Sequence, residues 1–394
     1  MDNESRSTLV VLALMTLFAV LVGTTILGIV ENWPRHRTVG AGQFKQPKSV
    51  DATVTGLQAV RCQAPGARSC SKVTVRIDAG SDKGTHQNFR FGDTGSDAKL
   101  SLGDKVLVYK NPLPPNAQLN GVKVPPYAFS DFQREQPMLW LLAVFVLVVL
   151  AAGRFHGLRA LVGLAASLAT VVFFVVPAIT DGRPPLQVAA FGALGVMLAT
   201  IPLVHGGGAK SLAACLGTAL ALLLTLGLAD LFTSLAHLSG LTTDEAIYLQ
   251  STTHVSIKGL LLAGMVIGSL GVLGDTTVTQ ASTVIALRRA NPALGWKELV
   301  THATSVGRDH IAATVNTLVL AYTGAALPVL LIFSLGGTSF GSAVNGEVVA
   351  APIVATLVGS IGLIAAVPVT TALAALLALQ LPERALRAEH LHAH

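Results

Sequence analysis

Residues 264–283 read GMVIGSLGVLGDTTVTQAST, and this stretch decides the fold because it begins as an apolar membrane helix and ends in polar residues. Its glycines recur every three or four positions and therefore share one helical face: Gly264, Gly268, Gly271 and Gly274. In membranes, a face of small residues lets a second helix approach closely. We therefore expect these four glycines to serve helix packing.

The polar half of the stretch begins with Asp275, which directly follows the last of these glycines. Asp275, Thr279 and Ser282 are spaced i, i+4 and i+7, so they also share one face. A carboxylate beside hydroxyl groups is what a polar site inside a helix bundle needs. Alternatively, Asp275 only caps a helix at the membrane edge, because hydroxyl residues follow it. The spacing alone does not distinguish a helix cap from a polar site.

The composition predicts a polytopic α-helical membrane protein. Hydrophobic residues make up 52% of the 394-residue chain and charged residues 12%, with a mean hydropathy of +0.62. A soluble domain carries about 25% charged residues. The net charge of +6 is therefore no sign of a nucleic-acid partner, and the lipid bilayer is the expected surrounding.

Apolar runs long enough, or nearly so, to cross about 30 Å of hydrocarbon predict about eight transmembrane helices. They cover residues 9–30, 138–152, 158–179, 186–204, 212–236, 257–274, 311–335 and 348–379. The first run lacks a small-residue cleavage pattern after it, which favours an uncleaved anchor over a removed signal peptide. Pro368 is expected to kink the last run.

A small all-β domain is predicted between the first and second helices, over residues 31–136. Apolar residues alternate with polar ones in 72–77, and further short strands are expected at 49–60, 88–91 and 105–110. The pattern suggests a barrel or sandwich, and we expect a five-stranded barrel of the oligonucleotide/oligosaccharide-binding type. No aromatic stacking platform is evident, so this domain is not expected to bind nucleic acid.

Cys62 and Cys70 lie in this domain, between two predicted strands. If the domain lies outside the cell, they are expected to form a disulfide, which would stabilise the hairpin by about 2–3 kcal/mol. A zinc site is the alternative, but it would need more ligands than these two thiols. Cys215 lies in an apolar run and is expected to be a buried small hydrophobic residue.

The loops between the runs differ in charge, and this predicts the orientation. One set carries Arg154, Arg159, Lys210, Arg288, Arg289, Lys297, Arg308, Arg384 and Arg387, whereas the other carries Arg183, Lys258, Asp244 and Glu245. The basic set should face the cytoplasm of a bacterial cell, with both termini inside and the β domain outside the plasma membrane. The expected domains are an anchor (residues 1–30), the β domain (31–136), a seven-helix core (137–380) and a cytoplasmic tail (381–394). Within the core, residues 275–309 are expected to form a cytoplasmic or re-entrant segment.

Two polar residues downstream, Asp309 and Asn316, are seven positions apart and share a helical face. Polar residues inside a span are costly and usually functional. The alternative for Asn316 is an interhelical hydrogen bond worth about 1 kcal/mol or less. His310 is expected to be an interfacial residue and not a metal ligand.

Three motifs resemble the YibE/F family of bacterial multi-pass membrane proteins, in its actinobacterial form. They are GVLGDTTVTQAS at residues 271–282, GRDHIAATVNTL at 307–318, and GSIGL at 359–363 followed by Val367 and Pro368. The resemblance covers most of the chain and is strongest from Arg134 onward. It implies the anchor, the outer domain and the multi-span core, and a presumed role in transport.

The function we expect is that of an ion-coupled secondary transporter or permease for a small ion or small molecule. The ion would bind at Asp275 and Asp309, with oxygen ligands from Thr279, Ser282 and Asn316, and a broken helix around Gly274 would supply free backbone groups. The alternative is an envelope accessory protein that binds a partner through its β domain.

We expect neither enzymatic activity, nor a cofactor, nor a metal site, because no phosphate-loop, HEXXH or GxSxG motif occurs. The terminal His390, His392 and His394 are expected to be a frayed end. The glycine seam would also suit a homo-oligomer.

Overall fold

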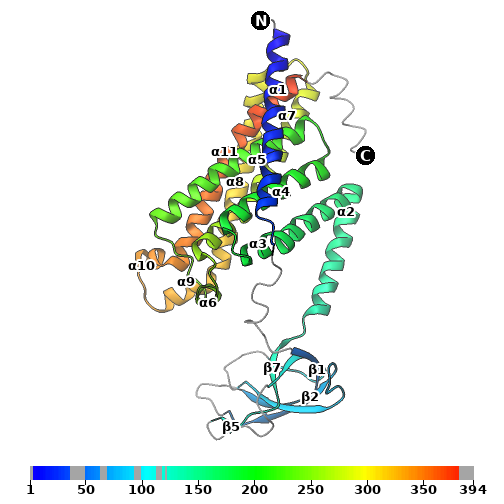
Figure 1. Ribbon diagram of the computed structural model, residues 1–394, viewed down its shortest axis with the longest axis vertical. Helices are drawn as coiled ribbons and strands as arrows, with labels where there is room; N and C mark the ends of the chain where they lie inside the picture. Colours follow the sequence, from blue (N-terminus) through cyan, green and yellow to red (C-terminus); the bar gives the residue numbers. More distant parts are fainter. Residues whose placement is uncertain are drawn as a thin grey trace. The chain divides into compact units, whose positions relative to one another are not determined.

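The computed structural model describes residues 3–35, 49–62, 69–92, 99–111, 118–119 and 122–380. The chain forms two compact units (Figure 1), which we call the β unit, residues 40–152, and the helical unit, residues 1–39 and 153–394. The three terminal histidines lie outside the described residues.

The β unit contains one antiparallel five-stranded sheet with the strand order β3-β2-β1-β4-β7. A separate two-stranded pair is formed by β5 and β6. The strands are β1 Ser49–Val60, β2 Cys70–Ile77, β3 His86–Phe91, β4 Lys105–Lys110, β5 Gln118–Leu119, β6 Val122–Lys123 and β7 Tyr127–Phe132.

The alternation in the sequence builds the core of this sheet. Val73 and Val75 of β2 and Val106 of β4 are fully buried, because every second side chain of a strand faces the same side. The sheet curls so that its edge strands meet: the rings of Phe91 in β3 and Phe129 in β7 are 4.9 Å apart, edge to face. The predicted all-β domain is thus confirmed as a small curled sheet, whereas the specific barrel type stays a prediction.

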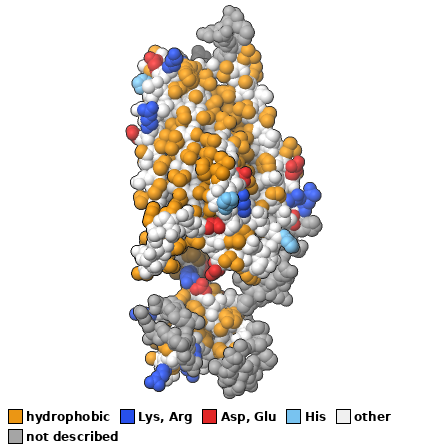
Figure 2. Space-filling view, turned by 90° about the vertical axis from the view of Figure 1, so that its left-hand side faces the viewer, with side chains coloured by type: hydrophobic (Ala, Val, Ile, Leu, Met, Phe, Trp, Pro, Cys, Tyr) orange, Lys and Arg blue, Asp and Glu red, His pale blue; other side chains and the backbone are white. Residues whose placement is uncertain are grey.

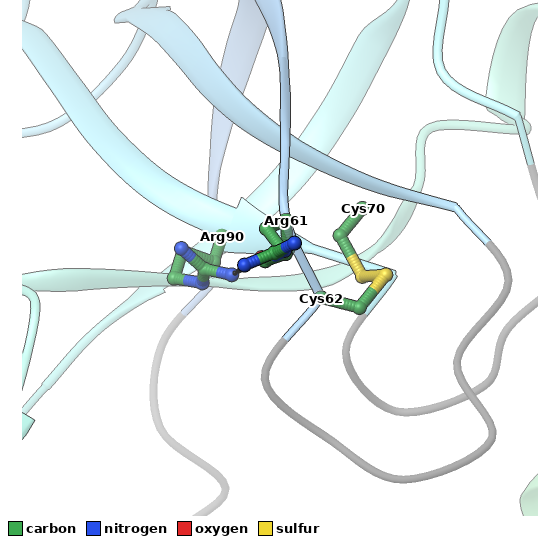
Figure 3. The surroundings of a disulfide bond; sticks show 4 residues. All are labelled: Arg61, Cys62, Cys70 and Arg90. Carbon is green, nitrogen blue, oxygen red and sulfur yellow. Dashed lines mark hydrogen bonds between the residues drawn. A yellow bond between two sulfur atoms is a disulfide. The ribbon is translucent and has the colours of Figure 1, made fainter.

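Cys62 and Cys70 form the predicted disulfide (Figure 3), with their Cα atoms 5.2 Å apart. The disulfide closes the connection between β1 and β2, which pair so that Val60 lies opposite Cys70. Beside it, the Arg90 guanidinium of β3 donates a hydrogen bond to the Arg61 carbonyl at 2.7 Å. The third cysteine, Cys215, is buried as expected.

The helices account for most of the rest of the described chain. They are α1 Asn3–Glu31, α2 Glu135–Thr170, the π-helical turn η1 Val171–Val175, α3 Val176–Thr180, α4 Pro185–His205, α5 Ala209–Leu235, α6 Asp244–Thr252, α7 Ile257–Ala290, α8 Trp296–Ala325, α9 Leu327–Leu335, α10 Phe340–Asn345 and α11 Glu347–Gln380. In the helical unit, the start of α1 and the end of α11 lie at the same end (Figure 1).

Six helical stretches of the described chain are long and apolar enough to cross a membrane, or seven if the bent pair α8–α9, with its 58° angle, is one span. About eight were predicted. The difference lies in Glu135–Thr180, which counts as one stretch of 46 residues although its backbone leaves helical geometry at Arg154; the sequence divides it into two runs. Hydrophobic side chains cover most of the face of the helical unit in Figure 2, which fits a membrane protein.

The centre of the helical unit is formed by α5, α7 and α11, which pack against one another. Two glycines make the closest approach between α5 and α11. A Cβ added to Gly217 would lie 2.0 Å from Thr370 Oγ1, and one added to Gly362 would lie 2.0 Å from Thr225 Oγ1. Each glycine therefore leaves the space that a threonine side chain of the facing helix occupies.

The α7 glycines make no close approach to another helix of the described chain, so their predicted packing role stays a prediction. A Cβ added to Gly264, Gly271 or Gly274 would meet no described atom within 4 Å, and at Gly268 it would make only an ordinary contact, 3.4 Å from the Tyr322 hydroxyl. The spacing correctly places the four on one helix, but it does not reveal what that side of the helix faces. Gly271 and Gly274 face a cavity.

α7 also runs without a break from Ile257 to Ala290, so the predicted broken helix at Gly274 is absent. Asp275 therefore caps no helix end. The segment 275–309 is the second half of α7, a short loop at the predicted break near Pro292, and the first half of α8. α11 likewise continues through Pro368.

Candidate functional site: a carboxylate in an apolar cavity

The first cavity, which we call the apolar cavity, has a volume of about 390 Å³ and lies between α2–η1, α4 and α7. Its lining is mostly aliphatic, and it includes Gly271 and Gly274 of α7 because the missing side chains leave this space open. Two ionisable residues line it, Asp275 of α7 and His205 at the end of α4. An ionisable pair in an apolar wall is the feature that points to a site.

Asp275 lies well inside α7, with fifteen residues between it and the nearer helix end. This corresponds to about 22 Å at 1.5 Å per residue. Its side chain is 75% exposed, and its Oδ2 lies 3.9 Å from Nε2 of His310 in α8. That nitrogen is itself buried and has no hydrogen-bond partner in the described chain. A separation of this size is too long for a hydrogen bond, so the two groups form a loose pair.

The opposite side of α7 is held by buried polar contacts, and these fix the direction in which Asp275 points. Thr277 and Thr218 of α5 share a hydrogen bond of 2.6 Å between their hydroxyl oxygens. Gln280 donates through Nε2 to the Ala303 carbonyl of α8 at 2.7 Å. Both residues are fully or almost fully buried. α7 is thereby locked to two neighbours with its Asp275 face toward the cavity.

The second cavity, which we call the basic cavity, has a volume of about 470 Å³. Four helices contribute its polar lining, from the second half of α2, the end of α4, the first turn of α5 and the second half of α7: His156, Arg159, His205, Lys210, Ser282 and Arg289. Val204 and His205 also line the apolar cavity, so the two cavities adjoin at the end of α4.

The structure separates the five predicted ion ligands. Asp275 lines the apolar cavity, and Ser282 lines the basic cavity while its hydroxyl donates to the Val278 carbonyl at 2.7 Å. Thr279 is exposed and lines neither cavity. Asp309 and Asn316 are exposed on α8 and also line neither. The five residues therefore do not form one coordination shell.

Two histidines that the sequence did not assign to the site lie near Asp275 instead of the predicted ligands. His310, predicted as an interfacial residue, is the α8 side chain that approaches Asp275, and His205 lines both cavities. Only the packing of α8 and α4 against α7 brings them there, and no local pattern encodes that packing. Within the described residues, no group of three or more His, Cys, Asp or Glu side chains could hold a metal ion.

Comparison with protein families gives one match: residues 141–380 fit the model described as YibE/F-like protein. This range contains the helices that build both cavities. Comparisons with curated proteins and with solved structures give no match.

Proposed function

Because the chain belongs to the YibE/F-like family, and because a carboxylate–imidazole pair adjoins a cavity among its apolar helices, we propose that it is an ion-coupled transporter. Asp275 binds the coupling proton or cation. The observation that carries this proposal is the position of Asp275, deep within α7 and open to the apolar cavity.

The energetics favour a functional role for this carboxylate. A charged group within a membrane span costs at least about 2.5 kcal/mol, and such residues usually mark ion or proton pathways. Nε2 of His310 lies 3.9 Å from the Asp275 carboxylate, and His205 lines the same cavity. A small movement of either side chain would bring the carboxylate and the imidazole into hydrogen-bond contact, across which a proton can pass.

The histidines extend the route away from Asp275. His205 lines the same cavity as Asp275 and continues into the basic cavity, so it provides the next titratable group along the end of α4. His310 provides a group on the α8 side. In this proposal Asp275 is the ion-binding residue, and the two histidines exchange protons with it.

We also infer that the chain crosses the membrane eight times. The Arg35 amide, just after α1, donates to Asp181 Oδ2, just after α3, at 2.9 Å, so these two points lie at the same end of the helical unit. Between them the chain must cross an even number of times. Among the described residues between them, the only candidate span is Glu135–Thr180, whose backbone departs from helical geometry at Arg154 (φ 45°, ψ −124°). We therefore divide this stretch into two spans at Arg154.

The decisive experiment compares Asp275→Asn with the wild type in liposomes. An imposed pH or sodium gradient should drive current or a change in internal pH with the wild type, and the variant should lose it. Asp309→Asn is the matched control, because it removes a carboxylate from α8 that lines neither cavity. Its flux should resemble that of the wild type.

Normal flux through Asp275→Asn would refute the proposal. If neither protein carries any flux although both are folded, transport by this chain alone is excluded, and the accessory function through the β unit becomes the better hypothesis. That hypothesis requires that disrupting the β unit, and not Asp275→Asn, abolishes the cellular function.

A further inference from the structure

The basic cavity has a chemistry that the proposed ion pathway does not use. Five cationic or protonatable side chains from separate parts of the chain converge on its wall: His156, Arg159, His205, Lys210 and Arg289. None of the described residues that line it is acidic. A cavity lined by positive charges attracts anions.

The start of α5 adds a second attraction for an anion at the same place. α5 is 27 residues long, and the residue before it, Gly208, has no side chain to cap its first amides. The preceding Gly206 and Gly207 line the cavity, and because they have no side chains, a ligand in the cavity can approach their backbone closely. The Ser211 hydroxyl holds this loop by donating to the Gly206 carbonyl. The N-terminal end of a helix carries a partial positive charge, and phosphate groups bind such ends.

The geometry also fits an anion attached to an apolar chain. The basic and apolar cavities adjoin at Val204 and His205, and one side of α7 lines both in succession. From Gly271 to Arg289 this side extends about 27 Å at 1.5 Å per residue. A phosphate among the basic groups would therefore have an apolar space next to it.

We propose that the basic cavity is a binding site for a phosphate group. Arg159, Lys210 and Arg289 supply the charge, and the amides at the start of α5 supply hydrogen-bond donors. The phosphate belongs either to the head group of an anionic lipid whose chain enters the apolar cavity or to a soluble phosphate. This proposal does not depend on ion coupling at Asp275.

The test uses the full chain in nanodiscs of phosphatidylcholine. One arm adds phosphatidic acid to the nanodisc and counts retained lipid by native mass spectrometry, and the other titrates inorganic phosphate and follows thermal unfolding. Binding in the lipid arm alone identifies a lipid head group, whereas binding in both arms identifies the phosphate itself as sufficient. Loss of one charge-assisted contact, in Arg159→Gln, Lys210→Gln or Arg289→Gln, should weaken binding by about tenfold or more.

Matched controls remove one positive charge from a different cavity. Arg183→Gln and Lys258→Gln alter a cavity that also contains Asp230, and they should leave phosphate binding unchanged. Arg289→Lys tests whether a loss reflects misfolding, because it keeps the charge and should retain most of the binding. Binding of neither probe by the wild type would overturn the proposal. Equal weakening by the control substitutions would also overturn it, since it would show a general attraction to a positive protein.

Discussion

At the scale of single residues, the contact of Gly217 with Thr370 predicts that Gly217→Ala destabilises the fold. Gly217→Ala places a methyl group 2.0 Å from Thr370 Oγ1 and 3.2 Å from the Thr370 Cα, so α5 and α11 must separate. Overpacking of this kind costs about 1–3 kcal/mol. Thermal unfolding in detergent should show a lower midpoint for Gly217→Ala than for the wild type.

Gly264→Ala is the matched control for Gly217→Ala. It adds the same methyl group to a helix where no described atom lies within 4 Å. Replacing a helical glycine with alanine without a clash stabilises by about 0.4–1 kcal/mol, so this variant should unfold at the same temperature or higher. If both substitutions lower the unfolding midpoint equally, the close contact of Gly217 with Thr370 is not the cause of the destabilisation.

A second residue-scale prediction concerns the pH dependence of the β unit. The Lys110 ammonium and the Tyr127 hydroxyl both donate to Asp82 Oδ2, and they hold the pKa of this carboxyl at about 2, below its ordinary value of 3.8. A lowered pKa in the folded state means that the ionised form stabilises the fold. This contribution is complete above pH 3.8 and is lost as the pH falls through about 2.

The measurement compares the unfolding midpoints of the wild type and Asp82→Asn as the pH is lowered. The wild type should be the more stable protein at neutral pH, and the difference should shrink as the pH falls below 3.8 and approaches 2. A difference that stays constant down to pH 2 would show that the charge on Asp82 does not contribute. Burial and the hydrogen bond to Asp82 raise the pKa of Tyr127 to about 12, so its hydroxyl remains a donor throughout this range.

At the scale of helices and strands, the sequence predicted what depends on local pattern. The strands 49–60 and 105–110 were placed with their observed bounds because alternation and turn residues are local signals. The length of α7 was underestimated. The polar residues after Gly274 were expected to end the span, whereas buried contacts of Thr277 and Gln280 with α5 and α8 compensate for their polarity.

The candidate site could be predicted only in part, for the same reason. Asp275 was recognised because a carboxylate after an apolar helix is unusual in any context. Its neighbours His310 and His205 come from helices distant in sequence, and their approach depends on how α8 and α4 pack against α7. Helical spacing instead favoured Asp309 and Asn316, which belong to the exposed side of α8.

An element-scale prediction follows from the start of α11. The Glu347 carboxylate accepts hydrogen bonds from the amides of Ser239 and Gly240, at 2.6 and 2.5 Å, and from the Ser239 hydroxyl at 2.8 Å. It thereby ties the first turn of α11 to the loop between α5 and α6. Glu347→Ala leaves these part-buried donors without their acceptor and should destabilise the chain by about 1–3 kcal/mol, measured by denaturation in detergent.

Glu347→Gln distinguishes the contribution of the hydrogen bonds to stability from that of the negative charge. Its side-chain carbonyl can still accept the two amide bonds, so it should recover part of the stability lost in Glu347→Ala. If glutamine is as damaging as alanine, the negative charge of Glu347 matters more than the acceptor geometry.

At the scale of the whole molecule, the two ends of the helical unit differ in charge. Arg159, Lys210 and Arg289 gather at one end of α5 and α7, whereas Arg183 and Lys258 share a cavity at the other, where Lys258 donates to Ser234 near the end of α5. The more basic end should face the cytoplasm. Because Arg35 lies at the opposite end from the start of α1, the β unit with its Cys62–Cys70 disulfide is then expected outside the cell, where disulfides persist.

This orientation can be tested by labelling Lys210→Cys and Lys258→Cys in intact cells with a membrane-impermeant thiol reagent. Both residues are part-buried. Lys210 lies in the first turn of α5 and Lys258 of α7 contacts Ser234 near the other end of α5, so they report on opposite sides of the membrane. We expect labelling at position 258 in intact cells and at position 210 only after permeabilisation, with Cys215 unreactive because it is buried. The reverse pattern would invert the orientation. Labelling of both positions from outside would contradict eight spans, because α5 could then not cross the membrane.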